Sequence, residues 1–559
     1  MFVHRLFPDF QTKRISPSLQ AKRTNLFAPP RLIEPPAMAG ANARIISQEL
    51  FDEAVTENIE VFELCEEEAV KETIDQFLKS GQFLHHLVLT HPDKGQEERA
   101  ERRRFLDALK SLDALVQSDG TVDYRSNAAQ VLQLIHQVAG CCNDHAFIYL
   151  TLLDAHDGIF TIMSFLSIVT GKDQVAEPAT RILLAALQAL TTILTPPQTL
   201  DLPVRELQAD LRDKVTPILQ TIVKLIELYE NESTLVLQLL KTSHACARTN
   251  EPNKREWMQG RRGVTLLLRI LQSNDHATLF AGCQLITVLC RFDDFRNTQG
   301  IVTSSAQDHV LEFGRQGIVP LLQFQVERNL LETDIDVDLV AAVLSAQRVM
   351  CIHDDIVQSM VAVGVISTIK QVFAVGDGNI PLTTATLGLV RNLCANDEVK
   401  CTLCVGEKNV LKEVLAAMAD NPEAGTLQEH GCGTLAAMAL RKPRNAIVII
   451  QEMGPGLILS AMQHHSTNIV LQRQGCLAIR NLISRVEQLV KDHLLDMGAE
   501  EVLRKAGQYQ ACVDEAYAAL RDLGCSVGRT TIHSDGTVST RPQMFGEVKA
   551  NFRPVYDDE

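Results

Sequence analysis

The chain of 559 residues carries 53 Lys and Arg against 69 Asp and Glu, which gives a formal net charge of −16. This acidic balance argues against a general binder of nucleic acid or of anionic membranes. Only 5% of the residues are aromatic although 46% are hydrophobic, so aliphatic residues and alanine must supply the core. That composition is typical of a helical protein rather than a β-sandwich, and the length predicts several domains or one extended repeat array.

The amino-terminal segment, residues 1–43, is predicted to be a disordered basic extension. Residues 1–37 hold six Lys or Arg and two acids, together with two Pro-Pro pairs. A mitochondrial presequence is one interpretation, because such segments are basic and poor in acids. Against it, the basic pairs lie among Pro and Gln without an amphipathic pattern, and Met38 is an alternative start. With no apolar run of the length that spans a bilayer, we expect a soluble protein of the cytoplasm, the nucleus or both.

Residues 44–117 predict an acidic helical arm followed by a linker. Apolar residues recur at helical spacing from Phe51 to Phe62 and again from Val70 to Phe77. Between positions 52 and 75 there are ten acids and one Lys, so the two helices are either solvated or dock on a basic surface. Residues 91–104 are charged and predict a linker, with a short helix after them over residues 105–116.

From residue 124 to residue 525 the chain repeats itself. A long apolar helical pattern recurs, and the last apolar residue of each clear copy falls at position 289, 350, 393, 438, 482 or 523. Weaker copies end near Val138, Ile193 and Ala245, and the long interval after Leu289 contains a polar insertion around Asn297–His309. A period near 44 residues indicates a helical solenoid, here of about eight repeats.

The order of segments inside each repeat indicates its class. A short apolar segment ends in glycine, a second apolar helix begins at once, and the long helix follows after a polar loop. The five junction glycines are Gly317, Gly364, Gly406, Gly454 and Gly498. Glycine allows a sharp turn between nearly perpendicular helices. This order of helices is typical of an armadillo repeat, whose units must stack to bury their apolar faces. The tail, residues 526–559, is predicted to be mostly disordered.

Several runs carry a more specific resemblance. Residues 46–62 (ISQELFDEAVTENIEVF) and 67–72 (EEAVKE), with carboxy-terminal runs such as Ile479-Arg-Asn-Leu482 and Ala519-Leu-Arg-Asp-Leu-Gly-Cys525, resemble the armadillo repeat-containing protein 6 family. The similarity extends from about residue 44 to residue 525, and residues 195–215 fit it less well. The resemblance implies an all-α fold, a right-handed armadillo superhelix, that acts as an interaction scaffold. It implies no reaction.

No residue pattern predicts an enzyme, a cofactor or a metal site. The chain lacks the spacing of a phosphate-binding loop, of a nucleophile elbow or of a zinc-protease helix. Its fourteen Cys are spread over the chain and mostly fall in apolar helical patterns, where they are typical of small core residues. Cys401 and Cys404 form the one CxxC, and no second pair completes a zinc site.

The long helix of each repeat, called the anchor helix below, lines the concave groove in armadillo superhelices. Two positions before its last apolar residue stand Arg348, Arg391, Arg480 and Arg521, with Ala436 interrupting the series. One hypothesis is that these arginines bind an extended acidic or amphipathic segment of a partner protein, because Arg pairs bidentately with carboxylates. The alternative is that they only bond neighbouring repeats. We also expect the acidic arm, residues 44–80, to be able to occupy the groove in cis.

Asn392 and Asn481 follow two of these arginines directly, where the equivalent asparagine of importin-α-like proteins holds a peptide backbone. Those proteins also place a Trp four residues earlier, and here the positions are Gly388 and Leu477. The single Trp of the chain, Trp257, cannot form an array. An importin-α-like receptor for basic signals therefore remains an alternative that the missing Trp array disfavours.

Overall fold

The computed structural model describes most of the chain from Ile46 onward. The described residues are 46–116 without 85, 124–142, 147, 158–166, 177–195, 209, 211–527 without 298–299, 377, 408 and 485–487, then 531–532 and 538–539. The expected basic extension and nearly all of the tail lie outside the described residues.

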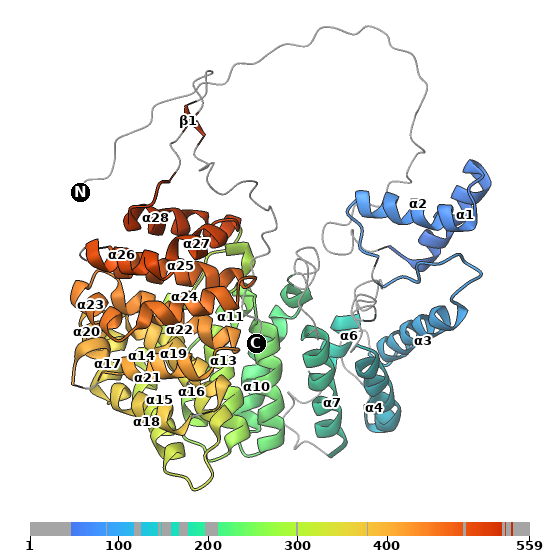
Figure 1. Cartoon of the computed structure of the whole chain (residues 1–559). Helices are drawn as coiled ribbons and strands as arrows, with labels where there is room; N and C mark the ends of the chain where they lie inside the picture. The colour runs from blue at the N-terminus through green and yellow to red at the C-terminus, as the bar shows by residue number, and fades with distance from the viewer. Residues whose placement is uncertain are drawn as a thin grey trace, which may run out of the picture.

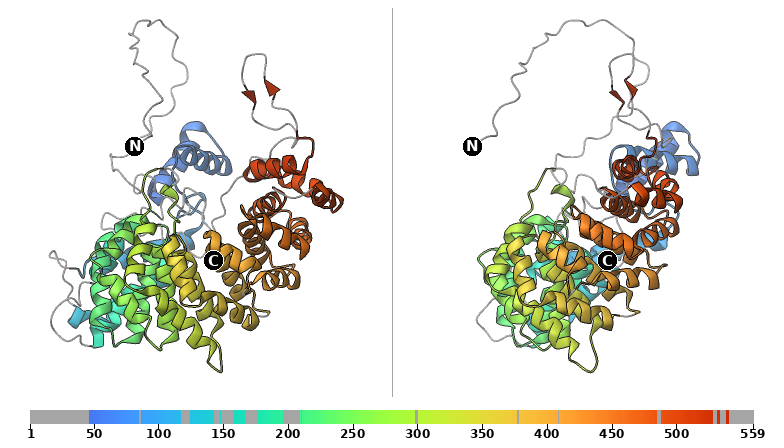
Figure 2. Two further views of the ribbon diagram at one scale, coloured as in Figure 1. Left: turned by 90° about the vertical axis from the view of Figure 1, so that its left-hand side faces the viewer. Right: turned by 60° about the vertical axis from the view of Figure 1, so that its left-hand side comes forward.

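The described part of the chain is an all-α solenoid (Figure 1). Its strands are β1 (Thr531–Ile532) and β2 (Val538–Ser539), which pair antiparallel. Figure 2 shows that the helices from green to red follow one another in chain order as one curved stack. The predicted fold class is confirmed. Among the described residues no single helix is both long and apolar enough to cross a membrane.

Within the described ranges, nine anchor helices form the spine of this stack. They are α4 (Tyr124–Cys141), α7 (Glu177–Leu194), α10 (Ser233–Ala247), α13 (His276–Leu289), α16 (Val337–Met350), α19 (Ile380–Leu393), α22 (Gly425–Ala439), α25 (Ile469–Ile483) and α28 (Val513–Leu523). Each packs against its neighbours in this series, so that only α4 and α28 at the two ends have a single anchor-helix neighbour. Because neighbours share their buried faces, one hydrophobic core runs without a break from Phe83 to Leu523.

Each repeat also contains shorter helices, which pack beside the anchor helices. The first helices are α11 (Glu251–Met258), α14 (Ala306–Arg315), α17 (Asp354–Ala362), α20 (Asp397–Val405), α23 (Pro443–Gln451) and α26 (Gln488–Asp496). The second helices are α9 (Leu219–Leu228), α12 (Arg262–Ile270), α15 (Ile318–Leu330), α18 (Val365–Val375), α21 (Leu411–Asp420), α24 (Gly454–His464) and α27 (Ala499–Ala506). The remaining helical segments are α6 (Gly158–Ser164), η3 (Thr216–Ile218), η4 (Phe295–Asn297) and η5 (Gln510–Cys512).

The predicted glycine turn is confirmed at three of the five junctions. Gly317, Gly364 and Gly498 adopt φ values of 83°, 99° and 83°, in the left-handed region that favours glycine. Between α17 and α18, Gly364 lies at a bend of 70° in the chain. Without a Cβ, the turn is reached at no steric cost.

The prediction is wrong for the conformations of Gly406 and Gly454. Gly406 has φ −71°, and five residues separate α20 from α21, so that connection needs no single left-handed residue. At the 75° bend between α23 and α24, Met453 adopts the left-handed conformation instead, with φ 65°. Gly454 serves close packing there, because a Cβ on it would lie 2.5 Å from Cγ2 of Ile449.

The amino-terminal arm is a hairpin of α1 (Gln48–Phe62) and α2 (Glu66–Lys79), followed by α3 (Gln96–Asp113). The hairpin has a small core of its own, which includes Phe51, Val55 and Ala69. The predicted linker over residues 91–104 is wrong in its second half, because α3 begins at Gln96. Gly95, with φ 69°, starts the helix, and acids in its first turn complement the helix dipole.

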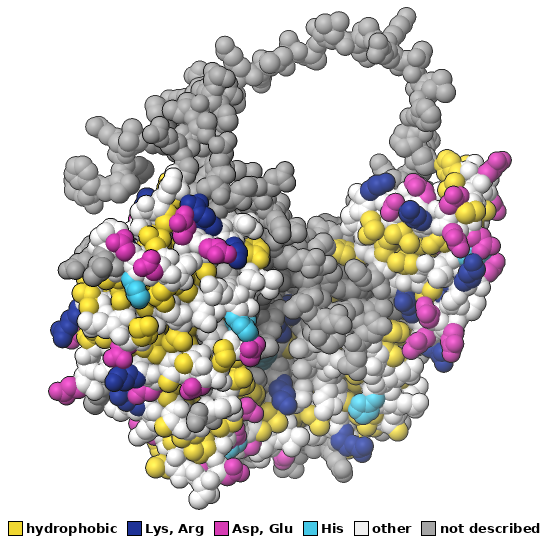
Figure 3. Space-filling model, viewed as in Figure 1, with side chains coloured by type: hydrophobic (Ala, Val, Ile, Leu, Met, Phe, Trp, Pro, Cys, Tyr) yellow, Lys and Arg dark blue, Asp and Glu magenta, His cyan; other side chains and the backbone are white. Residues whose placement is uncertain are grey.

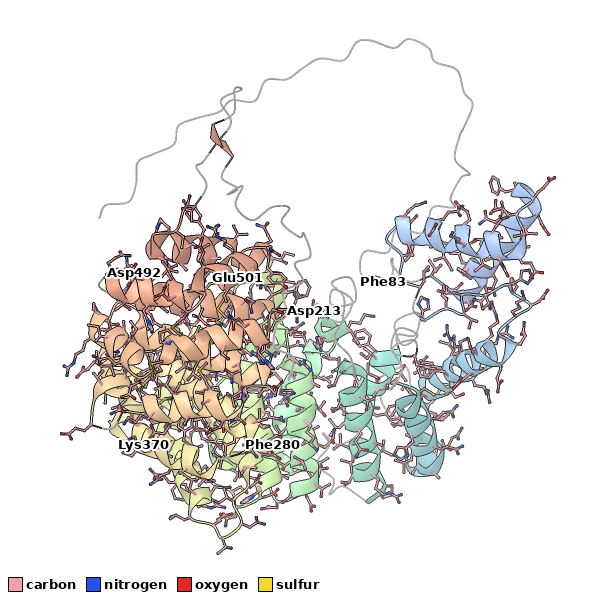
Figure 4. The ribbon with its side chains drawn as sticks, viewed as in Figure 1. Phe83, Asp213, Phe280, Lys370, Asp492 and Glu501 are labelled. Atoms are coloured by element: carbon pink, nitrogen blue, oxygen red, sulfur yellow. The ribbon has the colours of Figure 1, made fainter. Side chains whose placement is uncertain are left out.

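The insertion after α13 is folded around buried charge. Lys254 and Glu251 of α11 are both fully buried, and Lys254 pairs with Asp293 of the insertion. Arg296 donates to Asp213, which is labelled in Figure 4, at 2.9 Å. Burying charges costs several kcal/mol for each ion unless they are paired, so these pairs fix the path of the insertion. Its carboxy-terminal part is helical, since α14 begins at Ala306.

Replacing Gly364 by Ala tests the junction geometry. We expect the free energy of unfolding to fall by about 1–2 kcal/mol, because an L-residue is strained in the left-handed conformation. A Cβ on Gly364 would meet no atom within 4 Å, so a clash does not contribute. Gly140, inside α4, where an added Cβ would likewise meet no atom within 4 Å, is the matched control, and Gly140→Ala should leave stability unchanged or raise it. Urea unfolding followed by circular dichroism gives both values, and an equal effect of the two changes would contradict the account.

Candidate partner-binding site

The four predicted arginines lie in the last turns of their anchor helices. Arg348 is on α16, Arg391 on α19, Arg480 on α25 and Arg521 on α28. A cationic side chain near the carboxy terminus of a helix interacts favourably with the helix dipole. Because the anchor helices stack in order, the arginines recur at the same level of the spine, interrupted at Ala436 of α22 as the sequence indicates.

Arg348 and Arg391 each lie across the next anchor helix, at a glycine. A Cβ built on Gly388 would be 2.9 Å from Nη1 of Arg348, and a Cβ on Gly433 would be 2.9 Å from Nη1 of Arg391. The glycine of one repeat thus makes room for the arginine of the repeat before it. The repeat pattern alone did not predict this contact, although the sequence carries a signal for it: a glycine five residues before the last apolar residue of the following copy.

The two predicted asparagines bond to the preceding anchor helix of the spine. Nδ2 of Asn392 donates to the carbonyl oxygen of Arg348 at 3.1 Å, and Nδ2 of Asn481 donates to that of Ala436 at 2.9 Å. Both side chains are half-buried. Thr434 makes a similar bond to Leu387, at 3.0 Å. These amides therefore join neighbouring repeats, and each adds a second donor to a carbonyl that already accepts a backbone N–H from the end of its own helix.

The remaining two arginines have other surroundings. Arg480 is half-buried, whereas Arg521 is exposed and pairs with Asp522 of its own helix at 2.7 Å. Arg391 also donates from Nη2 to Oε1 of Gln474 on α25, at 3.3 Å, which links α19 to a helix two repeats away. The four arginines are thus equivalent in position but not in environment.

His430 of α22 belongs to the same region, although no sequence pattern singled it out. Burial lowers the pKa of its imidazole to about 3, and the charges of Arg348 and Arg391 act in the same direction. Its Nδ1 is buried and has no hydrogen-bond partner among the described residues. The preceding residue, Glu429, is buried as well. An uncharged imidazole therefore lies among charged groups at the centre of the spine.

Cys401 and Cys404, the candidates for metal or redox chemistry, both lie on α20. Cys404 is buried, and burial raises the pKa of its thiol to about 12. A neutral thiol is a poor nucleophile and a poor metal ligand. In the described part of the chain, no group of three His, Cys, Asp or Glu side chains is placed to hold a metal ion.

Comparison with known proteins relates this chain to armadillo repeat-containing protein 6. Residues 43–104 match the family described as the Armadillo repeat-containing protein 6 N-terminal domain. Armadillo repeat-containing protein 6 of Pongo abelii is 29% identical over 414 residues, which are 72% of this chain and 75% of that protein. The Homo sapiens protein of the same name is 29% identical over 417 residues, with the same shares. The resemblance to armadillo repeat-containing protein 6 is confirmed.

Among solved structures, an engineered protein covers 75% of this chain and 99% of its own, at 14% identity and a TM-score of 0.49. The repeat itself, with its nine stacked anchor helices, is what establishes the solenoid here. The match to the armadillo repeat-containing protein 6 amino-terminal domain spans α1, α2 and the first half of α3, so the acidic arm is a feature that the chain shares with that family.

Trp257, the one tryptophan, is fully buried in α11. A Cβ on Gly263 would lie 2.6 Å from Cζ3 of its indole, so the ring fills the space beside α12. At Gly388, where an importin-α-like protein has Trp, the guanidinium of Arg348 occupies that place instead. The aromatic cradle that such receptors use for lysine side chains is therefore not formed by these residues.

Removing either asparagine tests whether these amides hold the spine together. For Asn392→Ala and for Asn481→Ala we expect a loss of about 1 kcal/mol in the free energy of unfolding, since each change removes one hydrogen bond between neighbouring anchor helices. Asn409, whose bond is to Gly406 within its own loop, is the control, and Asn409→Ala should cost less. Thermal and urea unfolding measure the three variants. If Asn392→Ala and Asn481→Ala unfold like the wild type, the amides are free for another role.

The buried imidazole predicts a pH dependence of stability. The pKa of His430 is depressed from 6.5 in the unfolded chain to about 3 in the folded one, so the unfolded state binds the extra proton as pH falls below 6.5. Stability is therefore lost in that range. Between pH 7 and pH 5 the wild type should lose about 1–2 kcal/mol more than His430→Gln. Urea titrations at both pH values measure this difference, and parallel losses in the two proteins would show that His430 is solvated.

Proposed function

We propose that the chain is a non-enzymatic interaction scaffold of the cytoplasm or nucleus, which binds an extended segment of a partner protein across its anchor helices. The stacked anchor helices are the observation that supports this proposal. Packed helices lie roughly 10 Å apart, and an extended peptide rises about 3.3 Å for each residue. Each repeat would therefore correspond to about three residues of the partner segment.

The chemistry of the anchor helices favours an acidic or amphipathic segment. Arg348, Arg391, Arg480 and Arg521 occupy one position of the repeat, and Arg pairs with carboxylates bidentately. In this proposal Arg480 and Arg521 supply the charge that a partner reaches first, because Arg348 and Arg391 also pack against the next helix. Asn392 and Asn481 would contact the backbone of the segment through the amide oxygens, since their amide nitrogens bond within the spine.

The acidic arm is proposed as an intramolecular competitor for the same face. Its acids would meet the arginines if the hairpin left its contacts with residues 83–102. In the structure the arm is held by residues of that stretch: Nε2 of His86 lies 2.6 Å from the carbonyl oxygen of Ile46, and Arg99 pairs with Asp52. Deleting residues 1–90 tests the competition, because partner affinity and its salt dependence should both rise when a competitor is lost.

Charge reversal on the anchor helices tests the proposal itself. The four arginines are changed to Glu together, and an extended Glu-containing peptide is titrated in by fluorescence anisotropy. We expect at least a tenfold loss of affinity, because two like charges replace each ion pair, and we expect the salt dependence to reverse, since salt then screens a repulsion. Circular dichroism verifies the fold.

Arg261, Arg262 and Arg269, at the start and along the length of α12, are the matched control for a general loss of positive charge. All three are exposed, and each pairs with a carboxylate outside α12. The pairs are Arg261–Glu312, Arg262–Glu227 and Arg269–Glu230. Their reversal to Glu should leave peptide affinity within a factor of two. An equal loss of affinity in the triple control variant and in the quadruple variant would show non-specific attraction and would contradict a site on the anchor helices.

A further inference from the structure

The α1–α2 hairpin leaves apolar side chains uncovered on its outer surface. Val61 and Leu78 are 63% and 55% exposed, and Leu50 and Phe62 are exposed as well. Leu50 and Val61 lie three helical turns apart on one side of α1, and Phe62 follows at its end. Figure 3 shows hydrophobic side chains gathered over this hairpin with carboxylates at its outer edge. Several exposed apolar side chains on one small element mark it as a candidate interaction site.

Acids surround these apolar side chains. The hairpin holds ten acids and one Lys between positions 52 and 75, and Glu53, Glu57, Glu60, Glu67 and Glu68 are exposed. Two other acids are already used to position the hairpin: Asp52 pairs with Arg99, and Glu66 pairs with Lys94 at 2.9 Å. The surface is therefore both apolar and strongly negative.

The hairpin is held rigidly enough to present this surface. Nδ2 of Asn58 donates to Oγ1 of Thr73 at 2.8 Å inside the hairpin, which fixes the register of α1 against α2. Gln48 bonds to both the N–H and the carbonyl of Val88, at 2.8 and 3.2 Å. A binding surface that is ordered beforehand costs less entropy on binding.

We propose that this face of the hairpin binds a basic amphipathic helix of a partner protein. Leucine-like side chains of that helix would cover Leu50, Val61 and Leu78, while its Lys and Arg side chains would meet the surrounding carboxylates. The 15 residues of α1 span roughly 22 Å at 1.5 Å for each residue, so a helix of about four turns matches the face. A second copy of the hairpin and an anionic membrane both carry the wrong charge.

This site lies on the arm, apart from the anchor helices, and it takes the opposite charge from the groove of the proposed function. The two surfaces therefore predict different partners. A chain with both would join a basic helix at one end to an acidic segment along the solenoid. Failure of one proposal can be told from failure of the other, since the two sites share no residue and each is tested with its own peptide.

The test uses the full chain and a defined probe, a fluorescent 18-residue peptide of Leu and Lys with helical amphipathic spacing. Anisotropy is measured for the wild type and for Val61→Ser with Leu78→Ser, which keeps every acid. We expect binding in the micromolar range and at least a tenfold loss in the variant. A second variant, Glu57→Gln with Glu60→Gln and Glu67→Gln, should bind with a weaker salt dependence.

Phe324→Ser with Leu331→Ser is the matched control, because these side chains are 52% and 87% exposed on α15 and its end. It should bind as the wild type does, and a Leu/Glu peptide of the same pattern should not bind. Equal binding by the wild type and the Val61 and Leu78 variant would overturn the proposal, as would an equal loss in the control. Deletion of residues 1–37 should leave affinity unchanged. A tenfold gain would assign the face to that basic segment of the chain itself and would equally overturn the partner assignment.

Discussion

The packing of successive anchor helices against one another is the constraint on which the structure depends. A helix such as α22 is buried along nearly its whole length, and twelve of its fifteen residues are buried. No single repeat offers enough partners to cover such a helix, so the fold exists only as a stack. Side chains that remain at the surface of the spine are therefore placed by the packing of the repeats around them.

Polar contacts between repeats follow from that packing. When anchor helices approach closely, a side chain of one can reach a carbonyl of the other, and Asn392 and Asn481 bond to carbonyls of the preceding anchor helix in this way. Where a long side chain must cross the next helix, that helix has glycine, as at Gly388 and Gly433. The arginines of the proposed site thus have two roles. They cover the neighbouring repeat, and they carry the charge that a partner segment would meet.

The sequence predicted the class of fold because helical periodicity and a repeat near 44 residues are properties of the chain itself. It located the anchor helices and the arginines on them, since those positions recur. It did not predict that Arg348 lies on Gly388, because that contact joins residues 40 apart and depends on the distance between helices. Nor did it predict the buried His430 or the start of α3 at Gln96, where charged residues resembled a linker but lie on a helix whose other face packs on α4.

The arm and the solenoid are two distinct surfaces of one chain. The arm has a small core and many exposed acids, whereas the spine has a continuous core and recurring cations. Opposite charge on two such surfaces is a physical basis for holding two different partners, or for competition between a partner and the arm. Both readings depend on whether the anchor helices themselves contact a bound segment.

Site-specific crosslinking tests that central claim most directly. A photoreactive residue in place of Ser345, which lies three positions before Arg348 and is half-buried on α16, is compared with one in place of the exposed Leu331 at the end of α15. With a bound Glu-containing peptide, the account predicts crosslinks from position 345 and none from position 331. Crosslinks from position 331 alone would contradict it and would place the partner away from the anchor helices.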